Sequence, residues 1–246
     1  MGNIKLLVNQ LSIQNDRQEQ IIILQEINTL LLTQYTLKIE DDFIAYPVEI
    51  EAYYYSSLFL DDTVHKSELQ KNRFGKFYFH RKGQDRDNKI LFSRSGIDIC
   101  LSDSDEYFFG ILIRSARVND EENVINGPQL LAQRIYRYIC RDETLTSLSE
   151  ENRSVLMDFE RNTIVLHHTT VRSASLLIHS SRIGLNNESM YSNLHLRSLT
   201  DLNISKQKER DVLEYMRYND IVPTPDNIRK ILGSNSNWII EQMKSK

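Results

Sequence analysis

The chain of 246 residues is long enough for one large domain, or for one domain with an appendage. Hydrophobic residues make up 40% of it and charged residues 26%, as in soluble globular proteins, and no apolar run approaches the ~20 residues that span a bilayer. The formal net charge of −4 argues against a protein that simply coats nucleic acid. The first residues lack an export signal, so we expect a cytoplasmic protein without a membrane contact.

The first half of the chain predicts one helix followed by several strands. A helix is expected over residues 16–33, because apolar side chains recur there at helical spacing. Strands are expected at residues 35–40, 43–55, 77–80, 89–92, 97–101 and 108–115. Asp41-Asp42 is expected to form a hairpin turn, and residues 83–88 a polar loop. Cys100 and Cys140 lie far apart in apolar surroundings, which favours buried thiols over a disulfide or a metal site.

The second half predicts a change from strands to helices. A helix should begin at Gly127-Pro128, and strands are expected at residues 162–166, 176–183 and 195–199. Residues 206–220 and 237–243 are expected to be helical, as are residues 224–233, where Thr224 provides an N-cap and Gly233 a stop. These patterns indicate a main domain over residues 1–205 and a helical extension over residues 206–246, which packs on that domain or on a protein partner.

The strand at residues 46–55 carries the most informative pattern. Its side chains alternate, with Val48, Ile50 and Ala52 on one face and Glu49, Glu51 and Tyr53 on the other. A carboxylate beside aromatic rings could activate a water next to a stacked planar substrate. The alternative is a solvated strand face with ordinary charges.

A basic segment follows between residues 66 and 94. Nine Lys and Arg residues stand there against three acidic residues, a net charge of +6, and five aromatic residues are interleaved with them. Such a surface is expected to meet phosphates and bases, and we select Lys71, Arg73, Arg81, Arg94 and Ser95 as candidate nucleic-acid-binding residues. The alternative is a solvated, lysine-rich hairpin.

Seven short motifs resemble, in order, those of the alkyladenine (3-methyladenine) DNA glycosylase family. They are E-I-E-A-Y at 49–53, H-K-S at 65–67, N-R-F-G at 72–75, G-I-D-I-C-L-S at 96–102, L-I-R-S-A at 112–116, N-G-P at 126–128 and R-I-G-L at 182–185. The resemblance extends from about residue 30 to residue 199, with an insertion near residues 81–88. It implies an α+β domain with a curved, mostly antiparallel sheet surrounded by helices, to which the C-terminal helical extension is added.

The resemblance also implies an activity, which is hydrolysis of the N-glycosidic bond of a damaged purine flipped out of DNA. Glu51 would then activate water, and Arg114 would position it. Tyr53 and His65 would lie against one face of the base and Phe92 against the other, and Ser102 would contribute to selectivity. No metal or organic cofactor is implied.

Structural alternatives stand beside these roles. Glu51 and Arg114 could form a buried ion pair that only organises the sheet, while Tyr53 and Phe92 could be core aromatics. His65 could be a surface or capping histidine.

Three positions depart from the family pattern. Ser95 replaces the tyrosine that fills the gap left in a duplex, Ser102 replaces an asparagine that discourages normal guanine, and Phe92 replaces a pocket tyrosine. These departures keep open a protein that acts on single-stranded nucleic acid or nucleotides, and a non-catalytic nucleic-acid-binding module.

Overall fold

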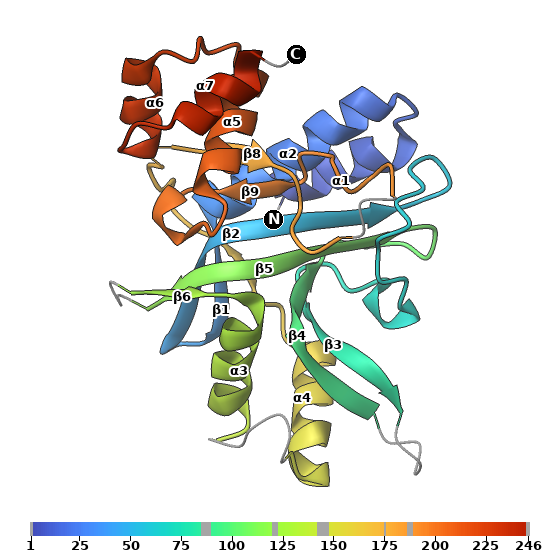
Figure 1. Ribbon diagram of the computed structural model, residues 1–246. Helices are drawn as coiled ribbons and strands as arrows, with labels where there is room; N and C mark the ends of the chain where they lie inside the picture. Colours follow the sequence, from blue (N-terminus) through green and yellow to red (C-terminus); the bar gives the residue numbers. More distant parts are fainter. Residues whose placement is uncertain are drawn as a thin grey trace.

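An antiparallel sheet with helices at both of its ends organises the molecule (Figure 1). The computed structural model describes residues 2–84, 90–119, 123–141, 148–174, 176–185 and 189–244. The helices are α1 (Gly2–Ile13), α2 (Arg17–Gln34), α3 (Pro128–Ile139), α4 (Glu150–Asn162), α5 (Lys208–Tyr218), α6 (Pro225–Leu232) and α7 (Asn237–Lys244). The strands are β1 (Tyr35–Glu40), β2 (Phe43–Tyr55), β3 (Phe77–Gln84), β4 (Ile90–Cys100), β5 (Phe108–Val118), β6 (Val124–Asn126), β7 (Leu166–His168), β8 (Ile178–Ser180) and β9 (Arg197–Leu199).

Strand β2 lies at the centre of the sheet, whose main order is β3-β4-β5-β2-β1-β7. It pairs with β1 and with β5, while the short strand β9 pairs with its middle, and β8 pairs with β9. All strand pairs in the described part of the chain are antiparallel. The predicted mixture of helices and a mostly antiparallel sheet is therefore confirmed.

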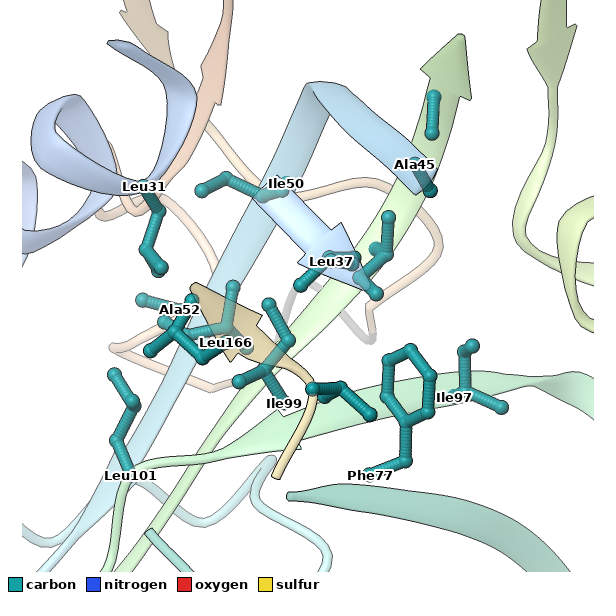
Figure 2. Close-up of a cluster of buried hydrophobic side chains, with 14 of the residues drawn as sticks. Leu31, Leu37, Ala45, Ile50, Ala52, Phe77, Ile97, Ile99, Leu101 and Leu166 are labelled. Carbon is teal, nitrogen blue, oxygen red and sulfur yellow. The ribbon is translucent and has the colours of Figure 1, made fainter. Parts of the chain in front are cut away.

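The alternation predicted for β2 decides which of its side chains enter the core. Ile50 and Ala52 are fully buried in the main hydrophobic cluster, together with Leu31 from α2 and Ile99 from β4 (Figure 2). Glu49, Glu51 and Tyr53, which alternate with these two residues, therefore lie on the opposite face of the strand. The hydrophobic face fixes the register of β2. On its polar face, Glu49 meets the Arg197 side chain of β9, and Glu51 meets the Ile183 N–H in the loop after β8.

Several predicted elements differ from the observed ones. The strands expected at residues 89–92 and 97–101 are one strand, β4, whose irregular pairing with β3 absorbs the polar residues between them. Helices α1 and α4 were not predicted, although Ser149 caps α4 as an N-cap should. The three strands expected in the second half are shorter than predicted, and the first of them is displaced because α4 continues to Asn162. The loop expected at residues 83–88 is wrong at its first two residues, which belong to β3, and the rest of it lies outside the described residues.

The C-terminal helices form a second hydrophobic cluster with β8 and β9. Its buried members are Ile178, Leu199, Leu202, Val212, Leu213, Met216, Ile228 and Ile239. The predicted caps of α6 are present, because the Thr224 hydroxyl accepts from the Asn227 N–H and Gly233 adopts a left-handed φ of 85°. The extension thus shares its core with two strands of the sheet. In the ranges that the structure describes, no helix has the length and apolarity needed to cross a membrane.

Candidate active site

The polar face of β2 meets an arginine from the neighbouring strand β5. Arg114 Nη1 lies 3.2 Å from Glu51 Oε1, and its Nε donates to Glu49 Oε1 over 3.1 Å. Glu51 lies opposite Leu112 of β5 and opposite Arg197 of β9 in the register of the sheet. The structure therefore brings together Glu51 and Arg114, the two residues that the sequence predicts as a catalytic pair.

Three contacts fix the Glu51 carboxylate, which is fully buried. Besides the contact with Arg114, Oε1 accepts the backbone N–H of Ile183 over 2.8 Å, and Oε2 accepts the Tyr53 hydroxyl over 2.9 Å. Burial raises the pKa of Glu51, and the charge of Arg114 and these hydrogen bonds oppose that rise without cancelling it. A carboxylate of this kind takes up a proton more readily than an exposed one, as a general base must.

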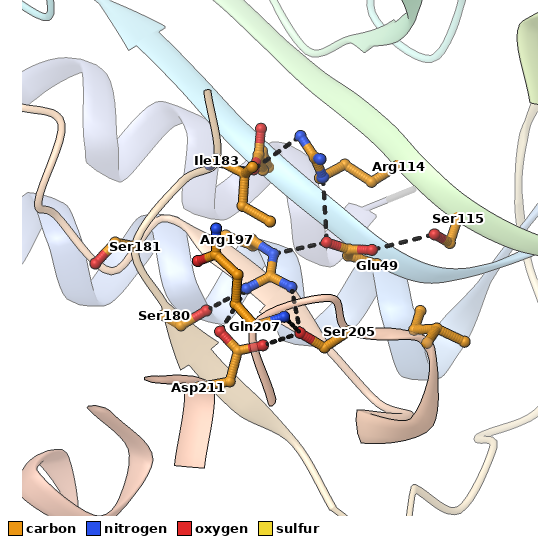
Figure 3. A network of polar contacts seen from close by, with 12 residues as sticks. Glu49, Arg114, Ser115, Ser180, Ser181, Ile183, Arg197, Ser205, Gln207 and Asp211 are labelled. Atoms are coloured by element: carbon orange, nitrogen blue, oxygen red, sulfur yellow. Dashed lines mark hydrogen bonds and ion pairs between the residues drawn. The ribbon is translucent and has the colours of Figure 1, made fainter. Parts of the chain in front are cut away.

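Glu49 is the centre of a larger buried network that reaches helix α5 (Figure 3). It accepts from Arg197 Nε over 2.6 Å and from the Ser115 hydroxyl over 3.1 Å. Arg197, itself fully buried, also donates to Asp211 Oδ1 over 2.6 Å. Three carboxylates here face two guanidinium groups, so the network carries one negative charge in excess.

A small cavity opens beside Tyr53. Its volume is about 140 Å³, and its lining is formed by Tyr53, Thr63, Val64, His65, Gln70, His80, Asp98, Gly110, Leu112 and Leu185. The guanidinium of Arg182, which is paired with Asp61 over 2.7 Å, lies 4.7 Å from the centre of the Tyr53 ring. Burial and the nearby charge of Glu51 raise the pKa of Tyr53 well above its ordinary value, so its hydroxyl stays protonated and donates to Glu51.

Three further polar side chains that line the same cavity are joined by hydrogen bonds. His80 Nε2 lies 2.8 Å from Asp98 Oδ1, and Asp98 Oδ2 accepts from Gln70 Nε2 over 2.9 Å. The rings of His80 and His65 are 5.7 Å apart between centroids. A cavity of this kind offers a flat, partly aromatic wall together with a charged hydrogen-bonding pair.

Gly110 makes room for this pair. A Cβ atom at position 110 would lie 3.0 Å from Asp98 Oδ2 and 3.0 Å from Gln70 Nε2. The carboxylate and the amide approach the backbone of β5 more closely than a side chain there would readily allow.

Phe92 and Ser102 do not line this cavity. The Phe92 ring packs in the main core, 6.1 Å from Phe79 and 6.4 Å from Tyr136 between centroids. The expectation that it stacks on a base is corrected, because β4 turns this side chain toward helix α3. The Ser102 hydroxyl is fully buried and is occupied by the backbone of Tyr107 and Phe109, so it fixes a loop and does not face a ligand.

Some of the predicted nucleic-acid-binding residues form ion pairs within the protein, and others lie at the surface. Arg73 and Arg81 both pair with the buried Glu160 of α4, at 3.0 and 2.6 Å, and this corrects the expectation that they face phosphates. Lys71 pairs with Glu68 and lies 4.6 Å from the centre of the Phe108 ring. Ser95 is exposed, and its hydroxyl lies 3.3 Å from His80 Nδ1. The side chain of Arg94 lies outside the described residues.

Several residues of this region were not selected from the sequence. Arg197 and Asp211 belong to segments expected only as a strand and a helix, and nothing in the local pattern marks them as partners of Glu49. The signal for His80 and Asp98 was stronger, because both lie in predicted strands with their side chains toward one face. Once the pairing of the two strands is known, His80 and Asp98 can be recognised as polar neighbours on one face.

The described residues hold no group of three or more His, Cys, Asp or Glu side chains that could bind a metal ion. Comparison with protein-family models and with curated protein sequences finds no match to this chain.

Proposed function

We propose that this chain hydrolyses the N-glycosidic bond of a purine nucleobase, with Glu51 as the base that activates water. Damaged, alkylated or deaminated purines in DNA are the first substrates to test, as the resemblance to the alkyladenine DNA glycosylase family implies. The observation that carries the proposal is the Glu51 carboxylate, which is held by three contacts and joined through the Tyr53 hydroxyl to the wall of the cavity.

The contacts of Glu51 leave one acceptor position of its carboxylate unused. A carboxylate offers about four lone-pair positions, and Arg114, Ile183 and Tyr53 use three of them. A water bound at the fourth position would be fixed beside a base whose pKa is raised by burial. The negative charge of the surrounding network would also stabilise the positive charge that develops on a sugar as its base departs.

The size of the cavity supports a single base as the bound group. Pockets for drug-sized ligands measure ~300–1,000 Å³, whereas this cavity measures about 140 Å³. A whole nucleotide is too large for that volume. A flat base can enter beside Tyr53 and the two histidine rings while its sugar stays outside.

Release of free base from oligonucleotides tests the proposal. The wild-type protein should release hypoxanthine or an alkylated purine, and Glu51→Gln should lower that rate by ~10²–10⁴-fold, since general-base catalysis contributes that much. Glu209→Gln provides a matched control, because this carboxylate lies on α5 and bonds to Ser236 away from the cavity. Its rate should equal that of the wild type.

The form of the substrate is tested in the same experiment. Duplex DNA, single-stranded DNA and RNA with one modified purine are compared, because Ser95 is too small to fill the gap that a flipped nucleotide leaves in a duplex. Release from single strands alone would assign the protein to unpaired nucleic acid. Absence of release from every substrate, or equal rates for Glu51→Gln and wild type, would overturn the proposal.

A non-catalytic nucleic-acid-binding module gains less support. Arg73 and Arg81, the two arginines central to that hypothesis, are engaged by Glu160 and mostly buried. Phosphate contacts require side chains that are free to reach the backbone of the nucleic acid.

A further inference from the structure

Helix α5 of the C-terminal extension holds the loop that follows β8. The carboxylate of Glu214 accepts the Ser181 N–H over 2.7 Å and the Ser181 hydroxyl over 2.8 Å. No other acceptor among the described residues bonds to the Ser181 N–H. The side chain of Glu214 is only 13% exposed, so this contact is largely shielded from competing water. Glu214 therefore fixes the backbone of the loop at its first residue.

The same loop carries the N–H that fixes the candidate base. Ile183 lies two residues after Ser181 (Figure 3), and its N–H donates to Glu51 Oε1 over 2.8 Å. Two residues of chain span at most ~7 Å, so a shift of the backbone at Ser181 moves the Ile183 N–H as well. The contact between Glu214 and Ser181 therefore acts on the Glu51 carboxylate through one short stretch of chain.

Arg182, between these two loop residues, is held by contacts of its side chain. Its guanidinium donates to Asp61 over 2.7 Å and to the Tyr191 carbonyl over 2.9 Å. These contacts lie at the end of a long side chain with several rotatable bonds, so they fix the backbone less closely than a bond to the backbone itself. Glu214 thus supplies the contact that lies nearest to the backbone carrying the Ile183 N–H.

A second carboxylate of α5 acts on the other glutamate of β2. Asp211 lies three residues before Glu214, on the same face of the helix. It accepts from Arg197 over 2.6 Å, and Arg197 donates to Glu49 over 2.6 Å. Arg197 also donates to the Ser180 hydroxyl over 2.8 Å, at the end of β8. Both glutamates on the polar face of β2 are therefore connected to α5 by short chains of contacts.

We infer that Glu214 is a positioning residue for Glu51, and that the C-terminal extension completes the active site instead of only packing beside it. Glu214 holds Ser181, and through Ser181 it keeps the Ile183 N–H on the carboxylate that activates water. The inference rests on the proposed function, to whose site it adds a residue from the extension.

Hydrogen exchange at the Ile183 amide tests the inference without any substrate. NMR follows the exchange in the full-length wild type, in Glu214→Ala and in Glu214→Gln. Glu214→Ala removes both acceptors of Ser181, so the Ile183 amide should exchange roughly 10-fold faster or more, as expected when a hydrogen bond to a charged group is weakened. Glu214→Gln keeps an oxygen for the Ser181 N–H and an amide NH₂ for its hydroxyl, so it should retain most of the protection. The amide of Ile113, which is fully buried in β5, is the reference for global opening.

Single-turnover release of base measures the consequence for catalysis. Glu214→Ala should lower the rate of release by roughly 10–100-fold, which is the contribution of one hydrogen bond to a charged group. The Kd of the oligonucleotide should stay unchanged, because Glu214 does not line the cavity beside Tyr53. Glu209→Ala is the matched control, since it removes a carboxylate of the same helix whose partner is Ser236. Its rate and its Kd should equal those of the wild type.

Glu214→Asp keeps the test decisive where Glu214→Ala lowers the population of folded protein. This variant retains the charge but withdraws the carboxylate by one methylene, so the Ile183 amide should again lose protection. Circular dichroism of each variant confirms that the comparison is made on folded protein.

The outcomes separate the inference from the proposed function. Exchange at Ile183 that matches the wild type in both Glu214→Ala and Glu214→Asp, relative to Ile113, overturns the inference whether or not base is released. An unchanged rate of release in an active protein, or a loss that lies in Kd alone, also overturns it. Faster exchange without release by the wild type supports the positioning of Glu51 and overturns the proposed hydrolysis. Faster exchange together with slower release supports both.

Discussion

Glu51 and Glu160 are both buried carboxylates held by arginine side chains, but the charges around them are balanced differently. Glu160 accepts from Arg81 through both of its oxygens, at 3.0 and 2.6 Å, pairs with Arg73 at 3.0 Å and accepts the Phe79 N–H. One carboxylate there satisfies two cations. Glu51 instead shares the single guanidinium of Arg114 with Glu49.

The two clusters therefore differ in what their carboxylates can do. Two arginine side chains hold Glu160, and its contacts join α4 to the strand β3. Burial around Glu51 outweighs the charges of Arg114 and Arg197 and favours uptake of a proton, and the Tyr53 hydroxyl joins the same group to the wall of a cavity. Burial and an arginine neighbour are common to both sites, so the count of opposing charges is the more informative feature.

The largest expected effect is on stability, and it distinguishes the two carboxylates directly. Glu160→Gln leaves two buried guanidinium groups without a carboxylate, and breaking a buried pair in this way costs ~3–5 kcal/mol. Glu51→Gln should change the free energy of unfolding by no more than ~1 kcal/mol, because the neutral side chain keeps an acceptor and Arg114 keeps Glu49. Urea unfolding at pH 7 measures both. An equal loss in the two variants would contradict the comparison.

The fold was largely predictable because its strongest signals are local. The alternation along residues 43–55 and the caps at Thr224 and Gly233 can be recognised from residues that are close in the sequence, and the structure contains them. Helix α4 was missed because only Leu156 and Glu160 are buried along its length, which leaves little apolar periodicity to detect. Its strongest contact is an ion pair with residues ~80 positions earlier in the chain.

The candidate site was predictable only in part, for the same reason. Glu51, Arg114, Tyr53 and His65 were selected through the motif resemblance, and the structure brings the first three into one network. Arg197, the buried arginine that donates to Glu49, comes from a segment 148 residues away, which no spacing rule connects. Arg73 and Arg81 were misassigned because a basic run shows its charge in the sequence while Glu160, which neutralises it, lies far along the chain.

A smaller effect is expected in the coupling energy between each glutamate and its arginine. Double-mutant cycles built from Arg→Met and Glu→Gln changes should give coupling energies within ~0.5–3 kcal/mol for contacting residues. The Arg81–Glu160 pair should lie near the upper end, since its contact is bidentate and charge-assisted. The Arg114–Glu51 pair should lie near the lower end, since one guanidinium serves two carboxylates.

Arg210–Glu214, a pair on one helix whose arginine is exposed, provides the reference cycle, at ~0.3–0.5 kcal/mol. A coupling for Arg114–Glu51 that equals or exceeds the one for Arg81–Glu160 would show that Arg114 holds Glu51 as firmly as Arg81 holds Glu160. That result would remove the distinction between the two clusters.

The smallest expected effect is a difference in the pH dependence of stability. Burial raises the pKa of Glu51 above 4.5 against the influence of Arg114, so protonation favours the folded state. The stability contributed by that protonation is present below 4.5 and is lost as the pH rises through the pKa of the folded state. Glu51→Gln cannot titrate, and its free energy of unfolding should therefore increase relative to wild type between pH 4.5 and neutrality.

Glu214 should show the opposite sign and is the matched comparison. Burial would raise its pKa, but hydrogen bonds from Ser181 and Arg210 outweigh burial and lower it below 4.5. Its stabilising contribution is present above that value and is lost as the pH falls through the lowered pKa. Glu214→Gln should therefore lose stability relative to wild type as the pH rises, while Glu51→Gln gains it, in urea titrations repeated across the acid range. Parallel pH profiles for the two variants would mean that Glu51 is an ordinary ion-paired carboxylate, and the charge excess around it would then have no chemical consequence.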